Sequence, residues 1–198
     1  MPSLFQKLFS RTPMARSTRA YEFGLQFLDL PSDPLVLDIG TGQGNGTAFL
    51  SRRLPDAQVV SLDIDLTCFK PDELAFGPKR PWFIQATAPA MPLATASLDA
   101  VVLVMTFHCL PQSQQVLAEV ARVLRPGGML LLADVDGHHW MARPFELVEH
   151  LFVSPFTHAY TPEELEQMTR QVGLADFQVH RRPGKERGFM MWVTARKP

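Results

Sequence analysis

Cysteine is scarce in this chain of 198 residues, and long apolar runs are missing from it. The two cysteines, Cys68 and Cys109, are too few for a disulfide framework and lack zinc-ribbon spacing, which favours a reducing, cytoplasmic environment. The longest mainly apolar run, AVVLVMTF at residues 100–107, is far shorter than the roughly 18 residues that span a bilayer. We therefore expect no membrane-spanning segment.

An excess of charge of one sign is lacking too, because 19 lysines and arginines face 20 aspartates and glutamates. The net charge of −1 gives no electrostatic reason to expect a nucleic-acid partner. With 46% hydrophobic residues, the composition is that of a globular protein, and the length suits one domain over residues 1–198. We expect a monomer or a homodimer. The histidines match no regular ligand spacing, so we expect no metal site.

The N-terminal residues are basic, and no acid precedes Glu22. Organelle targeting segments share this composition. We favour instead amphipathic helices at residues 4–9 and 19–28 that pack on the domain or lie over its ligand site. Residues 1–34 are thus expected to form a helical cap.

Apolar strand-like runs alternate with helical patterns from residue 35 onward. Runs that are apolar throughout are typical of strands covered on both faces, and the alternation predicts a mostly parallel, doubly wound α/β sheet. The expected strands are residues 35–40, 58–63, 82–86, 99–105 and 129–134. The expected helices between them are residues 47–54, 66–76 (weakened by Pro71) and 112–124.

The C-terminal region predicts one more helix and an edge hairpin. Thr161, Pro162 and Glu164 form a capping-box pattern, and Gly173 is the expected helix end. The runs FQVHRR and FMMWVTA flank a PGKERG turn, which predicts an antiparallel pair at one edge of the sheet.

Glycine is concentrated in the stretch VLDIGTGQGNG, which follows the first expected strand. Gly40, Gly42 and Gly44 let the backbone turn sharply and approach a ligand, whereas a plain strand-to-helix turn needs one glycine. A dinucleotide fingerprint requires glycine where Asn45 stands, which argues against a nicotinamide-dependent oxidoreductase, and a phosphate loop requires Gly-Lys-Ser/Thr. We therefore expect a nucleoside ligand without a pyrophosphate.

Two acids at strand ends support a nucleoside. Asp38 precedes the glycines, where a carboxylate can pair with a ligand's ammonium group directly or through water. Asp63 ends the second strand, where an acidic side chain can accept hydrogen bonds from both ribose hydroxyls.

These residues resemble a known family. VLDIGTGQGNGT and VVSLDID look like the first two cofactor motifs of class I S-adenosylmethionine-dependent methyltransferases, and VLAEVARVLRPGGMLLLAD resembles their small-metabolite, methyltransferase type 11-like branch. The resemblance covers residues 35–134 strongly and 161–195 loosely. It implies a Rossmann-like seven-stranded sheet, S-adenosylmethionine as cofactor, and methyl transfer to a small-molecule acceptor by in-line displacement.

The family's cofactor residues carry over onto matching positions. The resemblance places Asp38, Gly40, Gly42 and Gly44 along the methionine part of the cofactor, Asp63 on the ribose and Ile64 beside the adenine. The family's adenine-recognising acid falls at Thr87, which departs from the pattern; a threonine hydroxyl can still accept one hydrogen bond, and the N–H of Ala88 can donate to the ring. Met105 is placed near the methionine moiety, although a core methionine is an equal alternative.

An acceptor with a proton to lose needs a base, and His108, just after the fourth strand, is the candidate catalytic residue. A structural role for His108 at the strand end stays open. Residues 135–160 hold four of the six histidines and several aromatic residues, and we expect them to form a lid or substrate segment. A helix that packs on the sheet or on a second subunit is the alternative there.

The acceptor and the atom that is methylated cannot be inferred from these residues. The chain lacks the Asn/Asp-Pro-Pro-aromatic motif of adenine amino-methylation and the acids of metal-dependent catechol-type enzymes. A regulatory protein that binds the cofactor without turnover is the alternative function.

Overall fold

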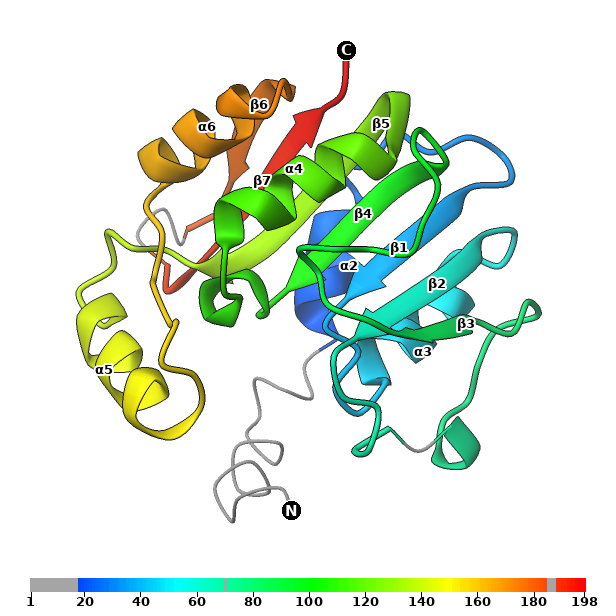
Figure 1. Cartoon of the computed structure of the whole chain (residues 1–198), viewed down its shortest axis with the longest axis horizontal. Coiled ribbons are helices and arrows are strands. Elements are labelled where there is room, and N and C mark those ends of the chain that lie inside the picture. Colours follow the sequence, from blue (N-terminus) through cyan, green and yellow to red (C-terminus); the bar gives the residue numbers. More distant parts are fainter. Residues whose placement is uncertain (1–17, 70, 185–187) are drawn as a thin grey trace.

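The computed structural model describes residues 18–69, 71–184 and 188–198, and its centre is a seven-stranded sheet (Figure 1). The strands are β1 Leu35–Ile39, β2 Gln58–Asp63, β3 Trp82–Gln85, β4 Leu98–Val104, β5 Leu124–Val135, β6 Ala175–His180 and β7 Met190–Arg196. The helices are α2 Arg19–Leu25, α3 Asn45–Arg53, α4 Ser113–Val123, α5 Ala142–Phe152 and α6 Pro162–Gln171, with short 3-10 helices η1 Pro71–Glu73 and η2 Phe107–Cys109. The helix expected at residues 4–9 lies outside the described residues.

The strand order is β3-β2-β1-β4-β5-β7-β6. β1 pairs in parallel with β2 on one side and with β4 on the other. Successive strands are therefore added on one side of β1 up to β3 and on its other side from β4 onward. β7 pairs antiparallel with both β5 and β6. The doubly wound sheet with an antiparallel edge hairpin is therefore confirmed, and its switch point lies where the glycine loop leaves β1.

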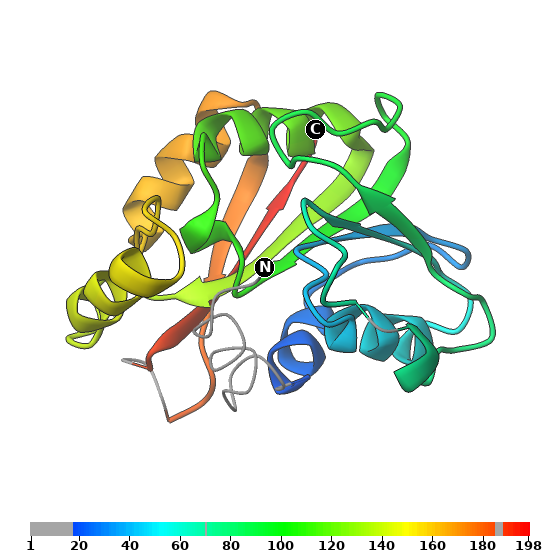
Figure 2. The ribbon, with the colours of Figure 1, turned by 60° about the horizontal axis from the view of Figure 1, so that its bottom comes forward.

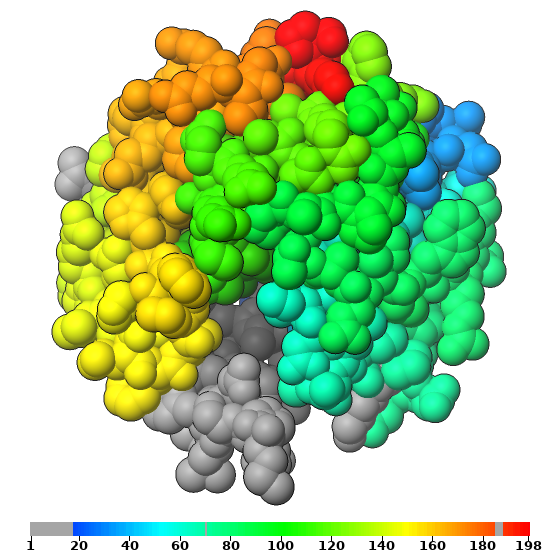
Figure 3. Space-filling model, viewed as in Figure 1, coloured from blue at the N-terminus to red at the C-terminus, as the bar shows by residue number. Residues whose placement is uncertain are grey.

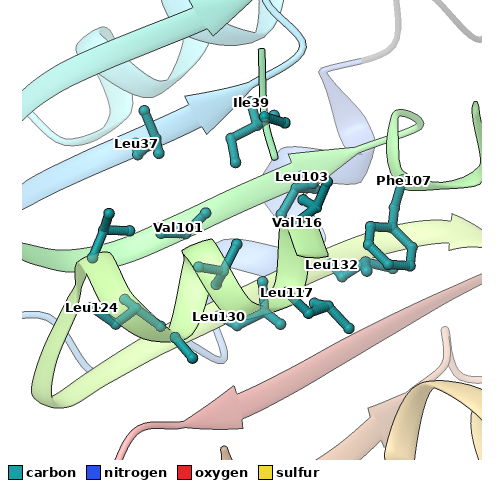
Figure 4. Packing of buried hydrophobic residues seen from close by; sticks show 14 of the residues in the cluster. Leu37, Ile39, Val101, Leu103, Phe107, Val116, Leu117, Leu124, Leu130 and Leu132 are labelled. Atoms are coloured by element: carbon teal, nitrogen blue, oxygen red, sulfur yellow. The ribbon is translucent and has the colours of Figure 1, made fainter. Parts of the chain in front are cut away.

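Helices cover both faces of the sheet (Figure 2). Alternate residues of β1 point to opposite faces, so Leu37 and Ile39 join the cluster beneath α4 and α6, whereas Val36 joins the cluster beneath α2 and α3. Figure 4 shows Leu37 and Ile39 with Val116 and the other side chains of the first cluster. Burial on both faces explains why these strands are apolar throughout.

Most expected helices are present with shifts of one or two residues. In α6, Thr161 accepts from the backbone N–H of Glu164, the Glu164 side chain accepts from the N–H of Thr161, and Gly173 has a φ of +82°. The capping box is therefore confirmed. α2 confirms the second N-terminal helix, although it ends at Leu25.

The helix expected over residues 66–76 is wrong, since the described part of this segment contains only η1. Asp65 accepts a hydrogen bond from the N–H of Thr67, which forms a local turn. Phe69 and Leu74 both lie against Gly44, so their apolar side chains cover the glycine loop. Local turn chemistry and this packing outweigh the helical pattern, which Pro71 already weakens.

β5 is longer than expected, because the R-P-G-G segment is extended and is part of the strand. Leu124 pairs with Leu98, and the register then shifts before Met129 pairs with Ala100. Gly127 has a φ of +82° within this irregular stretch. The strand residues 129–134 were expected, and they supply the buried centre of the sheet.

Candidate active site

The glycine loop after β1 is held against the chain after β4. Gly40 has a φ of +88°, and a Cβ at this position would overlap the side chain of Thr106. A Cβ on Gly44 would overlap the ring of Phe69, whereas a Cβ on Gly42 would meet nothing within 4 Å. Gly40 and Gly44 are thus required by close packing, and Gly42 faces open space where a ligand can approach the backbone.

Asp63 ends β2 beside this open space. Its Oδ2 accepts a hydrogen bond from the N–H of Gly42 (2.8 Å), and its Oδ1 accepts from the N–H of Asp65 (3.1 Å). The next residue, Ile64, is 66% exposed. The structure therefore brings Asp63 to the glycine loop with Ile64 directly after it, and their contacts with a cofactor stay a prediction.

Thr87 and Ala88 follow β3 at the same edge of the sheet. Thr87 is exposed, and Ala88 is buried. In the space-filling view, the surface is hollowed between the cyan chain that follows β2 and the yellow chain of α5 (Figure 3). The carboxyl ends of β1 and β4 point toward this region (Figure 1).

Asp38 lies behind the loop and is only 1% exposed. Its Oδ1 accepts from the Tyr21 hydroxyl (3.1 Å) and its Oδ2 from the Thr47 hydroxyl (2.7 Å), which also bonds Ser61. Burial raises the pKa of Asp38 from 3.8 to about 6, although the hydrogen bonds from Thr47 and Tyr21 oppose the rise. Asp38 ties α2 and α3 to β1, so contact with a ligand ammonium group stays a prediction.

His108 is the middle residue of η2 and follows Thr106, which packs on Gly40, by two positions. Its Nδ1 lies 2.7 Å from Oδ1 of Asp134, and its backbone N–H donates to Oδ2 of the same carboxylate (3.1 Å). Asp134 Oδ1 also accepts from the N–H of Val135 (2.8 Å). The Asp134 side chain thus fixes both the η2 turn and the imidazole.

A second carboxylate approaches the other side of the ring. Oε2 of Glu149, on α5, lies 3.9 Å from Nε2 of His108. Burial of the imidazole lowers its pKa, but the Asp134 and Glu149 carboxylates raise it, and the pKa of His108 lies above its usual value. The candidate base is therefore a buried histidine between two acids.

The expected lid segment covers this histidine. The ring of Phe145 packs edge-on against the imidazole at 5.2 Å between centroids. Further along, the N–H of His158 donates to the carbonyl of His108 (2.8 Å), and the Ser154 hydroxyl donates to the carbonyl of Cys109 (3.0 Å). Residues 135–160 are thus attached to η2 along much of their length.

Met105 lies on the α5 side of the site. It has a φ of +52° and packs against the small cluster of Val135, Ala142 and Ala159, together with Phe145. Proximity to the methionine part of a cofactor stays a prediction for this residue.

α5 exposes an apolar surface. Seven large apolar side chains on and beside this helix are each at least 39% exposed, and we call them the apolar α5 face. Leu147, Val148, Leu151 and Phe152 are on the helix, Trp140 precedes it, and Val153 and Phe156 follow it. Only Ala142 and Glu149 are buried on α5 itself. The helix therefore turns Glu149 and Phe145 inward and most of its large apolar side chains outward.

The sequence did not identify Asp134 and Glu149 as partners of His108. Asp134 was detectable, because it is in β5, next to β4, and the carboxyl ends of neighbouring parallel strands meet at one edge. Glu149 carried no signal, because an amphipathic pattern places an acid outside.

Other acids near the site have structural roles. Asp136 accepts from the N–H of His138 (3.0 Å) and forms an ion pair with Arg181, which fastens the chain after β5 to the chain after β6. Within the described ranges, no three His, Cys, Asp or Glu side chains are grouped to hold a metal ion. None of the helices found there has the length and hydropathy of a membrane span.

Comparison with known proteins identifies a match over the central sheet. Residues 37–132 match the family model described as a methyltransferase domain. A phthiotriol/phenolphthiotriol dimycocerosates methyltransferase of Mycobacterium ulcerans is 36% identical over 100 residues, which are 50% of this chain and 37% of that protein. A fatty-acid O-methyltransferase of Mycolicibacterium smegmatis is 36% identical over 104 residues, which are 50% of this chain and 36% of that protein.

Solved structures share the fold across nearly the whole chain. A possible histamine N-methyltransferase of Thermotoga maritima superposes with a TM-score of 0.71 and 19% identity, covering 93% of this chain and 91% of that one. The curated relatives, in contrast, are matched over less than half of their own length. The residues matched by the family model, 37–132, include the glycine loop.

Proposed function

We propose that this chain, which belongs to the class I S-adenosylmethionine-dependent methyltransferases, transfers the cofactor's methyl group to a hydroxyl oxygen of a small, largely apolar acceptor. The observation that carries the proposal is the buried pair of His108 and Asp134, placed two residues beyond the contact between Thr106 and Gly40. Such a pair suits an acceptor that must lose a proton.

The residues of the first half of the sheet fit the cofactor. The space that a Cβ on Gly42 would enter is open, and the half-exposed Asp63 with the exposed Ile64 lies next to it. We assign Asp63 to the ribose hydroxyls, Ile64, Thr87 and Ala88 to the adenine, and Gly40, Gly42 and Gly44 with Met105 to the methionine part. Asp38 supports this loop from behind.

Bound at this loop, the cofactor supplies a methyl group on a positively charged sulfur, which makes the group ready for transfer. The chain's own contribution is alignment, which is worth about 7 to 11 kcal/mol in well-oriented systems, and removal of the acceptor's proton. The ionised carboxylate of Asp134 can only accept hydrogen bonds, so Nδ1 of neutral His108 carries the hydrogen and Nε2 has the free lone pair. Nε2 is therefore the atom that takes the proton of the hydroxyl.

The apolar α5 face supports an apolar acceptor. Large exposed apolar side chains gather on α5, whose inner side covers His108, so the same helix borders the surface and the base. The relatives named for phthiotriol dimycocerosates and for fatty acids act on hydrocarbon-rich molecules. An acceptor with a hydrocarbon chain suits both observations.

Methyl transfer from labelled S-adenosylmethionine to a series of linear alcohols of increasing chain length tests the proposal. We expect turnover that rises with chain length, and we expect it to be lost in Asp63→Ala together with calorimetric binding of S-adenosylhomocysteine. Turnover with small amines but with no alcohol would reject the proposed acceptor. Cofactor binding without transfer to any acceptor would favour a regulatory protein.

Four further expectations complete the proposal. We place the protein in the cytoplasm, because its two cysteines are both free thiols in the structure. We propose a monomer or a homodimer. We propose no nucleic-acid partner, because a net charge of −1 gives no electrostatic attraction to one. We treat residues 1–198 as one methyltransferase domain with residues 135–160 as its lid.

A further inference from the structure

Glu149 is buried without a hydrogen bond to its carboxylate in the part of the chain that the structure describes. The residue is 6% exposed, and the charged atom that faces it is Nε2 of His108 at 3.9 Å. The other acid of α5 with a described ion pair, Glu146, is bound by both Arg143 and His158, whereas the described charged partner of Glu149 is His108.

The separation of 3.9 Å is informative in itself. It is too long for a direct hydrogen bond between Nε2 and Oε2, but it is well within the range of strong charge interaction. An imidazole that gains a proton at Nε2 becomes positively charged next to this carboxylate. Glu149 therefore stabilises the form of His108 that exists after proton removal, and Asp134 does so from the other side of the ring.

We propose that Asp134 and Glu149 are positioning residues for His108, with Asp134 fixing the ring and its tautomer and Glu149, carried by α5, holding the positive charge that His108 acquires during methyl transfer. This inference rests on the proposed function. As the oxygen–methyl bond forms and the methyl–sulfur bond breaks, the hydroxyl proton passes to Nε2, and the electron pair of the broken bond stays on the departing thioether. Charge is balanced, since the sulfonium's positive charge is replaced by that of the imidazolium.

The groups that face His108 agree with this assignment. Asp134 comes from β5 and Glu149 from α5, and His108 lowers the pKa of Glu149 against the larger effect of burial, which raises it. From η2 itself, burial raises the pKa of the Cys109 thiol to about 12, so this thiol stays neutral. The Tyr160 hydroxyl, whose pKa burial also raises, donates to Ser113 and stays neutral as well.

The side chain of His158, on the segment after α5, is directed elsewhere. Its Nδ1 lies 2.9 Å from Glu146 and its Nε2 lies 3.3 Å from Glu164. Only its backbone N–H reaches His108, through the carbonyl. The charge on the imidazole is thus controlled by two carboxylates, of which one arrives on the lid helix.

The first measurement is the pKa of His108 by NMR on histidine-labelled protein saturated with S-adenosylhomocysteine, which needs no acceptor. Glu149→Gln keeps the shape and removes the charge, and we expect it to lower the pKa of His108 by about one pH unit. Glu146→Gln, on the same helix, is the matched control and leaves this pKa unchanged. An unchanged pKa of His108 in Glu149→Gln overturns the inference.

The second measurement is the pH profile of turnover with the best alcohol of the series. Activity requires neutral His108, so it rises with pH through the pKa of this residue and levels off above it. In Glu149→Gln we expect the rise to move to lower pH and the plateau kcat to fall about tenfold, with the KM for S-adenosylmethionine unchanged. Asp134→Asn lowers kcat as well, and Asp134→Glu restores part of it.

Two results separate failure of the inference from failure of the proposed function. A lowered pKa of His108 with an unmoved pH profile means that Glu149 has a structural role only, and the inference is wrong. If the pKa of His108 is lowered in Glu149→Gln but the wild-type protein methylates no alcohol, the proposed function is wrong, and the inference falls with it.

Discussion

The two halves of the site are built by different means. In the cofactor half, around the loop after β1, backbone conformation and missing Cβ atoms form the surface, as Gly40 and Gly42 illustrate. In the acceptor half, around η2 and α5, buried side chains from three elements converge, as His108, Asp134 and Glu149 illustrate. Backbone requirements leave a trace in local sequence, whereas converging side chains do not, because their meeting depends on the fold.

The largest expected effect is on the cofactor half. Gly40→Ala places a Cβ into the Thr106 side chain at a φ of +88°, so we expect it to destabilise the protein by about 3 kcal/mol or more and to abolish binding of S-adenosylhomocysteine. Gly42→Ala, in open space at a φ of +51°, is the control for stability only and costs about 1 kcal/mol. Urea unfolding and calorimetry measure both, and equal costs for the two variants would contradict the packing argument.

The second prediction concerns the buried carboxyl behind the loop. The pKa of Asp38 is raised from 3.8 to about 6, so the folded state favours the protonated form. The stability that this provides is fully present below pH 3.8, is lost as pH rises toward 6, and stays absent above it. The loss corresponds to about 3 kcal/mol.

Asp38→Asn removes this titration and retains a polar side chain between Tyr21 and Thr47. We expect the variant to gain stability relative to the wild type between pH 4 and pH 6.5, as measured by urea unfolding at each pH. Parallel stability curves for the two proteins would show that Asp38 is not the group responsible.

In the acceptor half, His108→Ala is expected to lower kcat about 100-fold while cofactor binding stays unchanged. The reason is that His108 contacts Asp134 and Glu149 rather than the glycine loop. His150→Ala, which removes an exposed histidine of α5, is the matched control and leaves kcat unchanged. Weaker binding of S-adenosylhomocysteine in His108→Ala would break the separation between the two halves.

The contrast between the halves also sets what the sequence predicts. The strands and their mostly parallel arrangement follow from uninterrupted apolar runs that alternate with helical patterns, and the capping box of α6 follows from Thr161 and Glu164 alone. The expected helix over residues 66–76 is wrong because Asp65 forms a turn and Phe69 is drawn onto Gly44, and neither contact belongs to a helical pattern.

α5 shows the limit most clearly. Its helical pattern was detectable, but the usual rule places apolar residues inside and acids outside. Here Glu149 is buried, and Leu147 and Leu151 are more than 60% exposed. A helix that breaks the rule in this way is expected at a functional site, where burial of a charge is retained for a purpose other than stability.

The apolar α5 face gives a smaller expected effect. Leu147→Gln with Leu151→Gln leaves stability within about 0.5 kcal/mol, since both side chains are exposed. We expect the KM for a long-chain alcohol to rise about tenfold, or 1.4 kcal/mol, and the KM for a short one to stay the same. Arg143→Gln on the same helix is the control. Equal KM changes for long and short alcohols would remove this face from acceptor binding.

The smallest effect tests the one position at which the cofactor half departs from its family. Thr87→Asp introduces, at an exposed position after β3, the acid that the family uses for the adenine amine. A carboxylate is a stronger acceptor than a hydroxyl, so we expect S-adenosylhomocysteine to bind about fivefold more tightly, which corresponds to about 1 kcal/mol. Thr95→Asp adds the same charge before the amino end of β4, away from the carboxyl end of β3, and leaves binding unchanged. An equal gain in both variants would attribute the effect to net charge, whereas a loss in Thr87→Asp alone would mean that the adenine does not lie at this position.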